Sequence, residues 1–470
     1  MLVRRFYDDR LAQASYLIGC QRTGEAIVID PPRDAAPIVA AARSEGVRIT
    51  RVTETHIHAD FVSGARELAA ATGAALLLSA EGGTDWQYAY AEEAGATLLR
   101  DGDTIEMGGV RLDVMHTPGH TPEHLAFIVT DRARSDEPVA MVSGDFVFVG
   151  DVGRPDLLEK AAKVAGTMEA GARQLYRSLQ RLASLPDHLQ VWPGHGAGSA
   201  CGKALGAMPS STLGYERRTN WAFGAADEEA FVAAVLEGQP SPPTYFATMK
   251  RMNRDGPPLL GERGAPARLD PASFDEALRQ GRVVDVRPGA AYAGGHVRGT
   301  ISLPLIKAFT TWAGWLLDYD TPIALIAADA DAAEEAQRAL ASIGLDQVHG
   351  WFGPDLLDAR RDGPTWSAAR RGEVTEAESM SAAGRQVIDL RERNEWDAGH
   401  IPGAVHHPLG RIQEELGELD RETPLAIHCQ AGTRSGIGAS VLEEMGFTDV
   451  IDLNGGYGGW AASGRKAVGA

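Results

Sequence analysis

The sequence predicts an α/β protein built from three domains. Its 470 residues are enough for about three domains that each bury a core. In the first half, short apolar runs alternate with amphipathic stretches and with loops rich in histidine and aspartate, an order that suits an αββα sandwich. The second half contains one pattern twice, about a hundred residues apart, which indicates tandem domains rather than a solenoid. With a proline-rich stretch over 240–258 as a boundary signal, we expect domains at 1–262, 263–371 and 372–470.

Composition restricts the class of protein and its partners. A hydrophobic content of 44% and a charged content of 23% are typical of a soluble globular chain. The net charge of −19 argues against nucleic acid and against an anionic membrane as partners. No run approaches the ~18 apolar residues that span a bilayer, and the first residues lack a signal-peptide core. Three cysteines cannot form a dense disulfide framework. We therefore expect a cytoplasmic protein, and the sequence leaves a homo-oligomer open.

The predicted elements of the first domain alternate in type. Residues 14–19 and 25–30 are expected to form a hairpin. Apolar residues recur with helical spacing over 34–45, and the apolar run 47–52 predicts the next strand. A further helix is expected over 64–72. The residues that can bind a metal all lie in the loops between these elements.

Three polar loops follow apolar runs, as expected for side chains carried by strand ends. They cover residues 55–61, 117–121 and 143–145. One histidine from each of the first two loops and the acid of the third give His56, His120 and Asp145. Two histidines and one carboxylate form the ligand face that leaves positions open on non-haem Fe(II). Convergence of three strand-end loops is hard to explain by packing, so we predict a metal site here.

The order HxHxD…H…D…H, completed by His195, resembles the metallo-β-lactamase superfamily. Its two-metal hydrolases usually read HxHxDH, but this chain has Phe61 where the last histidine belongs. The pattern is similar to the persulfide dioxygenases of the superfamily, and Asp151 and Arg154 also match that family's loop. The resemblance implies one Fe(2+) per chain on the three residues named above. It also implies a set of residues that orient ligands or substrate: His58, Asp60 and His195.

Two further features of the first domain concern its substrate. Cys201 lies six positions after His195, and Lys203 could lower the pKa of its thiol, which predicts a role in handling sulfur. A buried structural cysteine is the alternative. A basic and aromatic group late in the domain is either a solvated face or a clamp for the carboxylates or phosphates of a thiol carrier such as glutathione or coenzyme A. The predicted substrate-binding residues are Tyr215, Arg217, Lys250 and Arg254.

The second half of the chain repeats itself. Residues 283–287 recur 104 positions later at 387–391, and 295–299 recur as 399–403. Both copies have the order strand, DxR, loop, GHxxG, which resembles rhodanese-like domains over residues 268–465. The resemblance implies two small α/β domains with parallel sheets. We expect the DxR and GHxxG residues to be structural, since both copies contain them.

Only the second copy has a nucleophile. Cys429 follows an apolar strand and precedes a helix, so backbone N–H groups and the helix N-terminus should hold its thiolate or a persulfide sulfur. Arg434 adds positive charge for an anionic acceptor such as sulfite. Four residues separate the two, the shorter loop of sulfurtransferases, whereas phosphatases of this fold have one more. Ala327 occupies the cysteine position in the first copy, which we predict to be inactive.

The whole chain resembles persulfide dioxygenase–rhodanese fusions. This resemblance implies that O2 oxidises a glutathione- or coenzyme A-type persulfide to sulfite, and that Cys429 then transfers sulfane sulfur to sulfite to give thiosulfate. Such a pair of reactions fits sulfide detoxification. Fusion of the two domains would raise the local concentration of sulfite at the second site. Two alternatives remain. One is a zinc-dependent, glyoxalase-II-like thioester hydrolase fused to a sulfurtransferase, and the other is a non-enzymatic sulfur carrier.

Overall fold

The computed structural model describes residues 1–470 except 158, 160–165, 204, 240, 262 and 470. The chain folds into two compact units. The first contains residues 1–263 with 342–344, and the second contains 264–341 with 345–470. Within the described residues, no helix combines the length and the apolar character that crossing a bilayer requires.

The first unit contains two six-stranded mixed sheets. The first sheet has the order β1-β2-β3-β4-β5-β6, antiparallel up to β3 and parallel from there on. Its strands are β1 (Leu2–Asp8), β2 (Gln13–Cys20), β3 (Glu25–Ile29), β4 (Arg48–Thr53), β5 (Ala75–Ser79) and β6 (Thr97–Leu99). The predicted hairpin is β2 with β3.

The second sheet has the order β12-β11-β10-β9-β8-β7, and only β10 and β11 are parallel. Its strands are β7 (Thr104–Met107), β8 (Val110–His116), β9 (Leu125–Asp131), β10 (Ala140–Gly144), β11 (Gln190–Pro193) and β12 (Ser211–Thr212). Because β10 and β11 are parallel, the loops that follow them leave the sheet at the same edge.

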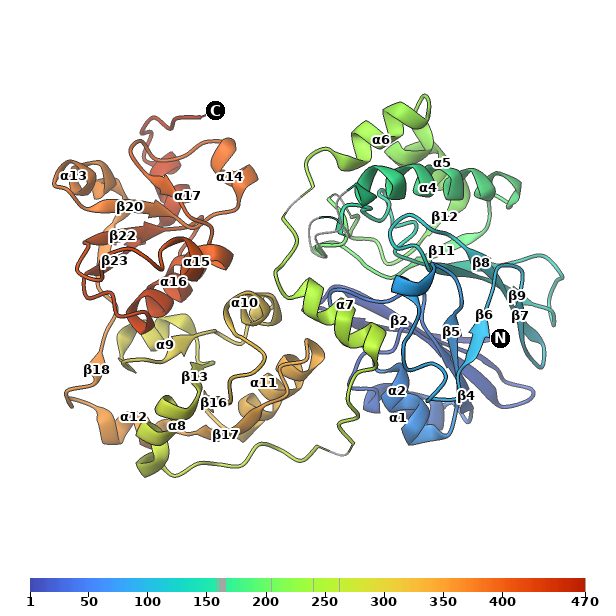
Figure 1. Cartoon of the computed structure of the whole chain (residues 1–470), viewed down its shortest axis with the longest axis horizontal. Coiled ribbons are helices and arrows are strands. Elements are labelled where there is room, and N and C mark those ends of the chain that lie inside the picture. The colour runs from blue at the N-terminus through green and yellow to red at the C-terminus, as the bar shows by residue number, and fades with distance from the viewer. Residues whose placement is uncertain (158, 160–165, 204, 240, 262, 470) are drawn as a thin grey trace. The chain divides into compact units, whose positions relative to one another are not determined.

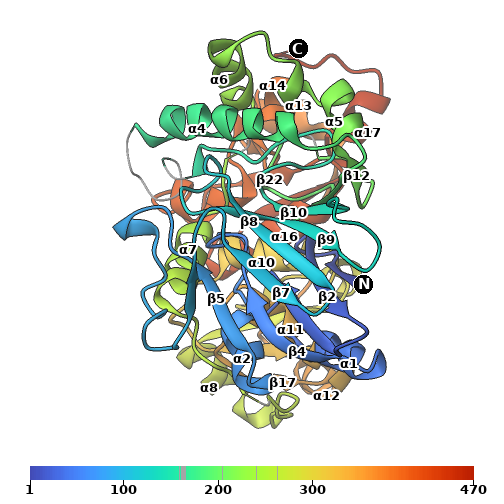
Figure 2. The ribbon, with the colours of Figure 1, turned by 90° about the vertical axis from the view of Figure 1, so that its right-hand side faces the viewer.

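Helices cover the outer face of each sheet. They are α1 (Ala36–Ser44), α2 (Ala65–Thr72), α4 (Thr167–Arg181), α5 (Leu213–Thr219), α6 (Glu228–Leu236) and α7 (Phe246–Asp255), with short 3-10 turns η1 (Thr84–Trp86), η2 (Leu182–Ser184) and η3 (Trp221–Gly224). Figure 1 and Figure 2 both place α1 and α2 beside the first sheet and α4 beside the second. Apolar side chains of the two sheets, such as Tyr16 and Phe127, form one core between them. The predicted αββα sandwich is confirmed.

The second unit contains both copies of the repeat. In the first copy all four strands of the sheet β15-β13-β16-β17 are parallel. Its elements are η4 (Pro271–Ser273), α8 (Phe274–Gln280), β13 (Arg282–Asp285), α9 (Gly289–Gly294), β14 (His296–Val297), β15 (Ile301–Ser302), α10 (Phe309–Leu316), β16 (Ile323–Ile326), α11 (Ala330–Ser342), β17 (Val348–Phe352), α12 (Pro354–Arg360) and β18 (Trp366–Ser367).

The second copy has the five-stranded parallel sheet β19-β23-β22-β20-β21. Its elements are β19 (Arg371–Glu373), η5 (Val374–Glu376), α13 (Ala377–Ala382), β20 (Gln386–Asp389), α14 (Arg393–Asp397), β21 (Val405–His406), η6 (Leu409–Arg411), α15 (Ile412–Glu415), β22 (Leu425–His428), α16 (Thr433–Glu444), β23 (Val450–Asn454) and α17 (Gly456–Ala462). Parallel sheets with crossover helices agree with the tandem rhodanese-like domains expected from sequence.

The DxR and GHxxG motifs make the same two contacts in each copy. Arg391 is buried, and its guanidinium donates to the carboxylate of Asp389 at 2.7 Å and to the carbonyl of Gly399 at 2.7 Å. Arg287 makes the equivalent two contacts in the first copy. The motif therefore ties the end of β13 in the first copy and of β20 in the second to the segment that begins with the GHxxG glycine, which is a structural role.

We predict that Asp389→Ala lowers the free energy of unfolding by about 3–5 kcal/mol, because it leaves the buried Arg391 charge without its carboxylate. Urea denaturation of the full chain measures this loss. Glu378→Ala is the matched control, since it breaks an ion pair with Arg465 whose side chains are 49% and 42% exposed and is expected to cost less than about 1 kcal/mol. Equal losses in the two variants would contradict the prediction.

Candidate functional site

The first ligand loop leaves β4 and is held by Asp30, at the end of β3. The backbone N–H of Thr55 donates to Oδ1 of Asp30 at 2.6 Å, and the Thr55 hydroxyl donates to Oδ2 at 2.9 Å. The same hydroxyl lies 3.0 Å from Nδ1 of His56. These contacts fix the backbone just before His56 and the orientation of the His56 ring. The other ring nitrogen, Nε2, is therefore available to bind a metal ion.

Histidines and an aspartate from three loops meet at one point. One ligand atom from each of His56, His120 and Asp145 lies within 4.8 Å of the others. Nε2 of His120 is 3.4 Å and Nε2 of His56 is 3.9 Å from Oδ2 of Asp145. Nδ1 of His120 faces the carbonyl of Arg154 at 2.9 Å, which turns Nε2 toward the aspartate. The structure therefore brings together the three residues that the sequence selects as metal ligands.

The donor atoms of this group fit a divalent cation. Both carboxylate oxygens of Asp145 are buried without a hydrogen-bond partner among the described residues. Burial and neighbouring imidazoles hold the pKa of His56 well below its usual value, and burial also lowers the pKa of His120. Neutral imidazoles are the form that binds metals. A buried carboxylate with no partner is costly, and a cation at this point would offset that cost.

His124 is a site residue that the sequence analysis missed. Its Nε2 accepts the backbone N–H of Asp145 at 3.1 Å, and its Nδ1 faces the hydroxyl of Thr117 at 2.8 Å. Gly144 has a φ of +51°, and a Cβ there would lie 2.6 Å from the hydroxyl of Thr55 and 2.7 Å from the His124 ring. This close approach requires glycine before the ligand aspartate. The only sequence signal for His124 is its position four residues after His120.

A second group of ligand-type side chains lies beside the first. Single atoms of Asp60, His195 and Cys201 also lie within 4.8 Å of one another. Nε2 of His195 is 3.3 Å from Oδ2 of Asp60 and 3.5 Å from Oδ1 of Asp145. Nδ1 of His195 faces the carbonyl of Ala12 at 3.0 Å, which directs Nε2 into the site. Asp145 therefore presents one oxygen to each group.

The predicted activation of Cys201 by Lys203 is wrong. Burial raises the pKa of the Cys201 thiol well above its usual value, and the carboxylates of Asp60 and Asp145 raise it further. The ammonium of Lys203 instead donates to the carbonyl of Ala234 at 2.6 Å. Proximity in sequence did not place the charge beside the sulfur, so Cys201 is a buried, neutral thiol facing the second group.

The His58 ring contacts that of His56, with centroids 4.2 Å apart, but its Nε2 is turned toward Asp30. Its Nε2 lies 3.1 Å from Oδ1 of Asp30, and its ring contacts that of Phe61 with centroids 4.4 Å apart. Burial opposes protonation of His58, but the carboxylates of Asp30 and Glu54 raise its pKa to about 9. Phe61 is fully buried. No sequence pattern marks Asp30, which organises both His58 and the loop of His56.

Asn253 of α7 supports the same loop from a distant part of the sequence. Its amide nitrogen donates to the carbonyls of His58 and Phe61, both at 2.7 Å, and its oxygen accepts the backbone N–H of Ser63 at 2.9 Å. The side chain is buried. No motif marks it, because its partners are backbone groups almost two hundred residues earlier.

The four predicted substrate-binding residues do not form one cluster. Tyr215 and Arg217 belong to α5, whereas Lys250 and Arg254 belong to α7, and these helices lie apart in both views (Figure 1, Figure 2). The guanidinium of Arg217 pairs with the carboxylate of Asp187, and the Tyr215 side chain is 52% exposed. The single anion clamp that the sequence suggests therefore does not exist as one site.

Of these residues, Lys250 lies nearest the metal-binding loops. Its ammonium sits 3.5 Å from the ring centroid of Trp86, and burial lowers its pKa to about 8. Its charge lowers the pKa of Glu123, whose carboxylate accepts the N–H of Ile57 at 2.7 Å, although burial dominates and raises that pKa to about 7. Arg254 pairs with the adjacent Asp255 at 2.8 Å.

The reactive loop of the second copy connects β22 to α16. Sγ of Cys429 accepts the backbone N–H of Gly432 at 3.1 Å and lies 3.7 Å from the hydroxyl of Ser435. The cysteine is 1% exposed. Arg434 forms a two-bond ion pair with Glu395 at 2.5 and 2.7 Å. The arginine expected to attract an anionic acceptor is thus already paired with a carboxylate.

Strand register identifies the equivalent position in the first copy. Asp389 pairs with His428 in the second copy, and Asp285 pairs with Ile326 in the first. The next residues are therefore equivalent, and they are Cys429 and Ala327. Residues 327–329 separate strand from helix in the first copy, against 429–432 in the second. The first copy lacks the nucleophile, and its loop is one residue shorter.

Comparison with known proteins agrees with these folds. The family described as the metallo-beta-lactamase superfamily matches residues 8–195, and the rhodanese-like domain family matches residues 270–350 and 373–463. The crystal structure of a metallo-beta-lactamase from Staphylococcus aureus subsp. aureus COL is 42% identical, covers 75% of this chain and 98% of its own, and superposes with a TM-score of 0.68. The chain belongs to the metallo-beta-lactamase superfamily. Two rhodanese-like domains follow the metallo-beta-lactamase fold.

Curated relatives of the metallo-beta-lactamase fold have two kinds of name. A hydroxyacylglutathione hydrolase of Polaromonas sp. strain JS666 is 35% identical over 199 residues, which cover 42% of this chain and 66% of that one. The mitochondrial persulfide dioxygenase of Homo sapiens is 29% identical over 198 residues, which cover 42% of this chain and 68% of that one. The domains of this chain are of enzyme type.

We predict that Asn253→Ala lowers the free energy of unfolding by at least about 2 kcal/mol and reduces the metal bound per chain, because two carbonyls and one N–H of the ligand loop lose their partner. Denaturation and metal analysis of the purified chain measure the two effects. Arg254→Ala, the next residue of the same helix, removes only a half-exposed ion pair and should change neither. A loss of stability without loss of metal would contradict the role of Asn253 in the site.

Proposed function

We propose that the metallo-beta-lactamase part oxidises a low-molecular-weight persulfide with O2, and that the last domain transfers sulfane sulfur to the sulfite formed. The observation that carries this proposal is the buried group of two histidines and one aspartate, with Phe61 where two-metal hydrolases have another histidine. The similarity to a protein named a persulfide dioxygenase supports it. The balanced reaction would convert persulfide, O2 and water into the free thiol, sulfite and two protons.

The residues present fit one Fe(2+) held by His56, His120 and Asp145. When bound, Fe(2+) would supply the redox chemistry that joins sulfur to O2. The contacts of Thr55 and Arg154 direct the two imidazoles before any metal binds. Burial of all three ligands excludes bulk water from the reacting sulfur.

The second reaction needs only residues of the reactive loop. The thiolate of Cys429 would attack the outer sulfur of a donor, forming an S–S bond as the donor's own sulfur leaves with its electron pair. Sulfite would then attack the outer sulfur of that cysteine persulfide, giving thiosulfate and restoring the thiolate. The N–H of Gly432 already points at Sγ and can stabilise either anionic sulfur.

Metal analysis combined with O2 uptake on glutathione persulfide tests the function. We expect about one iron per chain and O2 uptake that Asp145→Asn abolishes. Cys429→Ser should retain O2 uptake and lose thiosulfate, since the first site does not use this cysteine. Thiosulfate output that is unchanged in Cys429→Ser would contradict the relay, and absence of iron or of O2 uptake in the wild type would contradict the dioxygenase.

A zinc-dependent thioester hydrolase fused to a sulfurtransferase is the second candidate, and the group of Asp60, His195 and Cys201 is the observation in its favour. Sulfur, imidazole and carboxylate ligands suit zinc, and these three residues would supply ligands for a second ion beside the first group. The similarity to a protein named a hydroxyacylglutathione hydrolase agrees with it. Two zinc ions per chain, cleavage of S-lactoylglutathione and loss of one ion in Cys201→Ser would establish this candidate instead.

We also predict that Glu395→Gln lowers the KM for thiosulfate about threefold or more in a thiosulfate:cyanide sulfurtransferase assay, with a smaller change in kcat. Glutamine removes the negative charge that pairs with Arg434 yet can still cap α14. Glu378→Gln, an exposed residue of the same domain, is the charge control. An unchanged or raised KM would show that Arg434 does not receive the anion.

A further inference from the structure

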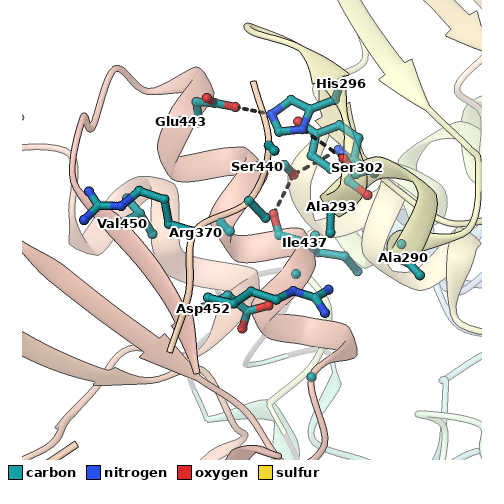
Figure 3. A pocket seen from close by; sticks show the side chains of 18 of the residues that line it. Ala290, Ala293, His296, Ser302, Arg370, Ile437, Ser440, Glu443, Val450 and Asp452 are labelled. Carbon is teal, nitrogen blue, oxygen red and sulfur yellow. Dashed lines mark hydrogen bonds and ion pairs between the residues drawn. The ribbon is translucent and has the colours of Figure 1, made fainter. Parts of the chain in front are cut away.

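A cavity of about 700 Å³ lies between the two rhodanese-like copies of the second unit (Figure 3). Ala290 and Ala293 of α9 line one side, and Ile437 and Ser440 of α16 line the other. Its volume is in the usual range for small-molecule sites. Among the described residues that line it, neither Cys429 nor Arg434 is present. The cavity therefore adjoins the sulfur-transfer site through Gly432 of the reactive loop but includes neither its cysteine nor its arginine, and the proposed reactions place no substrate in it.

One carboxylate oxygen in the cavity lacks a partner. Asp452, on β23, lines the cavity and is 6% exposed, and its Oδ1 accepts no hydrogen bond from the described residues. Burial raises its pKa, while a hydrogen bond with Ser435 and the charge of Arg371 lower it. Buried carboxylate oxygens almost always have a donor, so an orphaned one facing a cavity indicates a missing donor.

A guanidinium stands next to this carboxylate without pairing with it. β19 and β23 are parallel neighbours, and Arg371 is the direct register partner of Asp452. In the part of the chain that the structure describes, no ion pair within 4.0 Å joins the two. By contrast, the preceding Arg370 pairs with Asp449 at 2.5 Å. Backbones of neighbouring strands are about 4.8 Å apart, so these two side chains start from adjacent positions without forming a direct ion pair.

The other charged groups of the cavity have ion-pair partners among the described residues: His296 and Arg298 pair with Glu443, and Arg370 pairs with Asp449. Glu443 accepts from Nε2 of His296 at 2.6 Å, as Figure 3 shows, and from the hydroxyl of Ser367 at 2.9 Å. The hydroxyl of Ser440 donates to the carbonyl of Ile437. The groups left to recognise a ligand are one carboxylate and one guanidinium on adjacent strands, opposite an apolar wall.

We propose that this cavity binds a small molecule with an α-amino acid group, its ammonium on Asp452 and its carboxylate on Arg371. In such a group the ammonium and the carboxylate sit on one carbon, so two side chains that start from adjacent strands can contact one charge each. A carboxylate can take two parallel hydrogen bonds from a guanidinium. The ligand's side chain would lie against Ala290, Ala293 and Ile437. The backbone of residues 431–433 also lines the cavity, so the ligand would lie behind the loop of Cys429.

Calorimetric binding of three matched probes to the full chain tests the proposal. S-methyl-L-cysteine has both charges, 3-(methylthio)propanoate lacks the ammonium, and 2-(methylthio)ethylamine lacks the carboxylate. The methyl group prevents reaction with Cys429. We expect S-methyl-L-cysteine to bind at least about 10-fold more tightly than either analogue, because each lost charged hydrogen bond costs that much.

Variants assign each charge to its residue. Asp452→Asn should weaken S-methyl-L-cysteine about 10-fold and leave 3-(methylthio)propanoate unchanged. Arg371→Gln should weaken S-methyl-L-cysteine about 10-fold and leave 2-(methylthio)ethylamine unchanged. Arg465→Gln makes the same change in charge outside the cavity and should have no effect, and an unchanged unfolding midpoint in each variant shows that the domain is intact. No binding of S-methyl-L-cysteine, equal binding of all three probes, or binding that both variants leave unchanged would overturn the proposal.

Discussion

The carboxylate of Asp145 is the group on which the first site depends. It is buried, neither oxygen has a hydrogen-bond partner among the described residues, and each oxygen faces a different set of ligand-type side chains. Leaving such a group unpartnered would cost several kcal/mol. The surrounding structure nevertheless holds it in place through the N–H bond to His124 and the left-handed Gly144. These contacts keep the Asp145 carboxylate in position to bind a cation.

The sequence predicted the ligand residues in the loops of the site, but not the residues that hold those loops in place. His56, His120 and Asp145 could be found because each follows an apolar strand, and strand ends place loops together. Asp30 and Asn253 could not be found, because they act on backbone N–H and carbonyl groups that any residue possesses. For Cys201 and Lys203 the sequence suggested an interaction that the structure does not contain. The two residues are two positions apart, but their side chains contact different partners, so the ammonium does not lower the pKa of the thiol.

Comparison of the two rhodanese-like copies distinguishes residues that the fold requires from residues that sulfur transfer would require. Both keep the arginine that joins its own strand-end aspartate to the GHxxG loop, and this part of the fold was predictable from the repeat. Only the second keeps the cysteine and the longer loop. The pairing of Arg434 with Glu395 was not predictable, since no local pattern links residues 39 positions apart. Any anion that approached Arg434 would have to compete with this carboxylate.

The protonation of Cys201 bears on whether the first site holds one metal or two. Phe61 stands in place of one histidine, but His195 still lies 3.5 Å from Oδ1 of Asp145 and 3.3 Å from Oδ2 of Asp60, so ligand-type side chains remain beside the first group. A thiol becomes a good ligand only as a thiolate. At Cys201, burial and two carboxylates oppose loss of the proton, and the one nearby ammonium is bound elsewhere. A second ion that binds Cys201 would have to displace the thiol proton. It would also lack the histidine that Phe61 replaces. The first group needs no such step, because its imidazoles are already neutral and its aspartate has no partner. Of the two groups, that of His56, His120 and Asp145 is therefore the one whose donor atoms can receive a cation without first losing a proton.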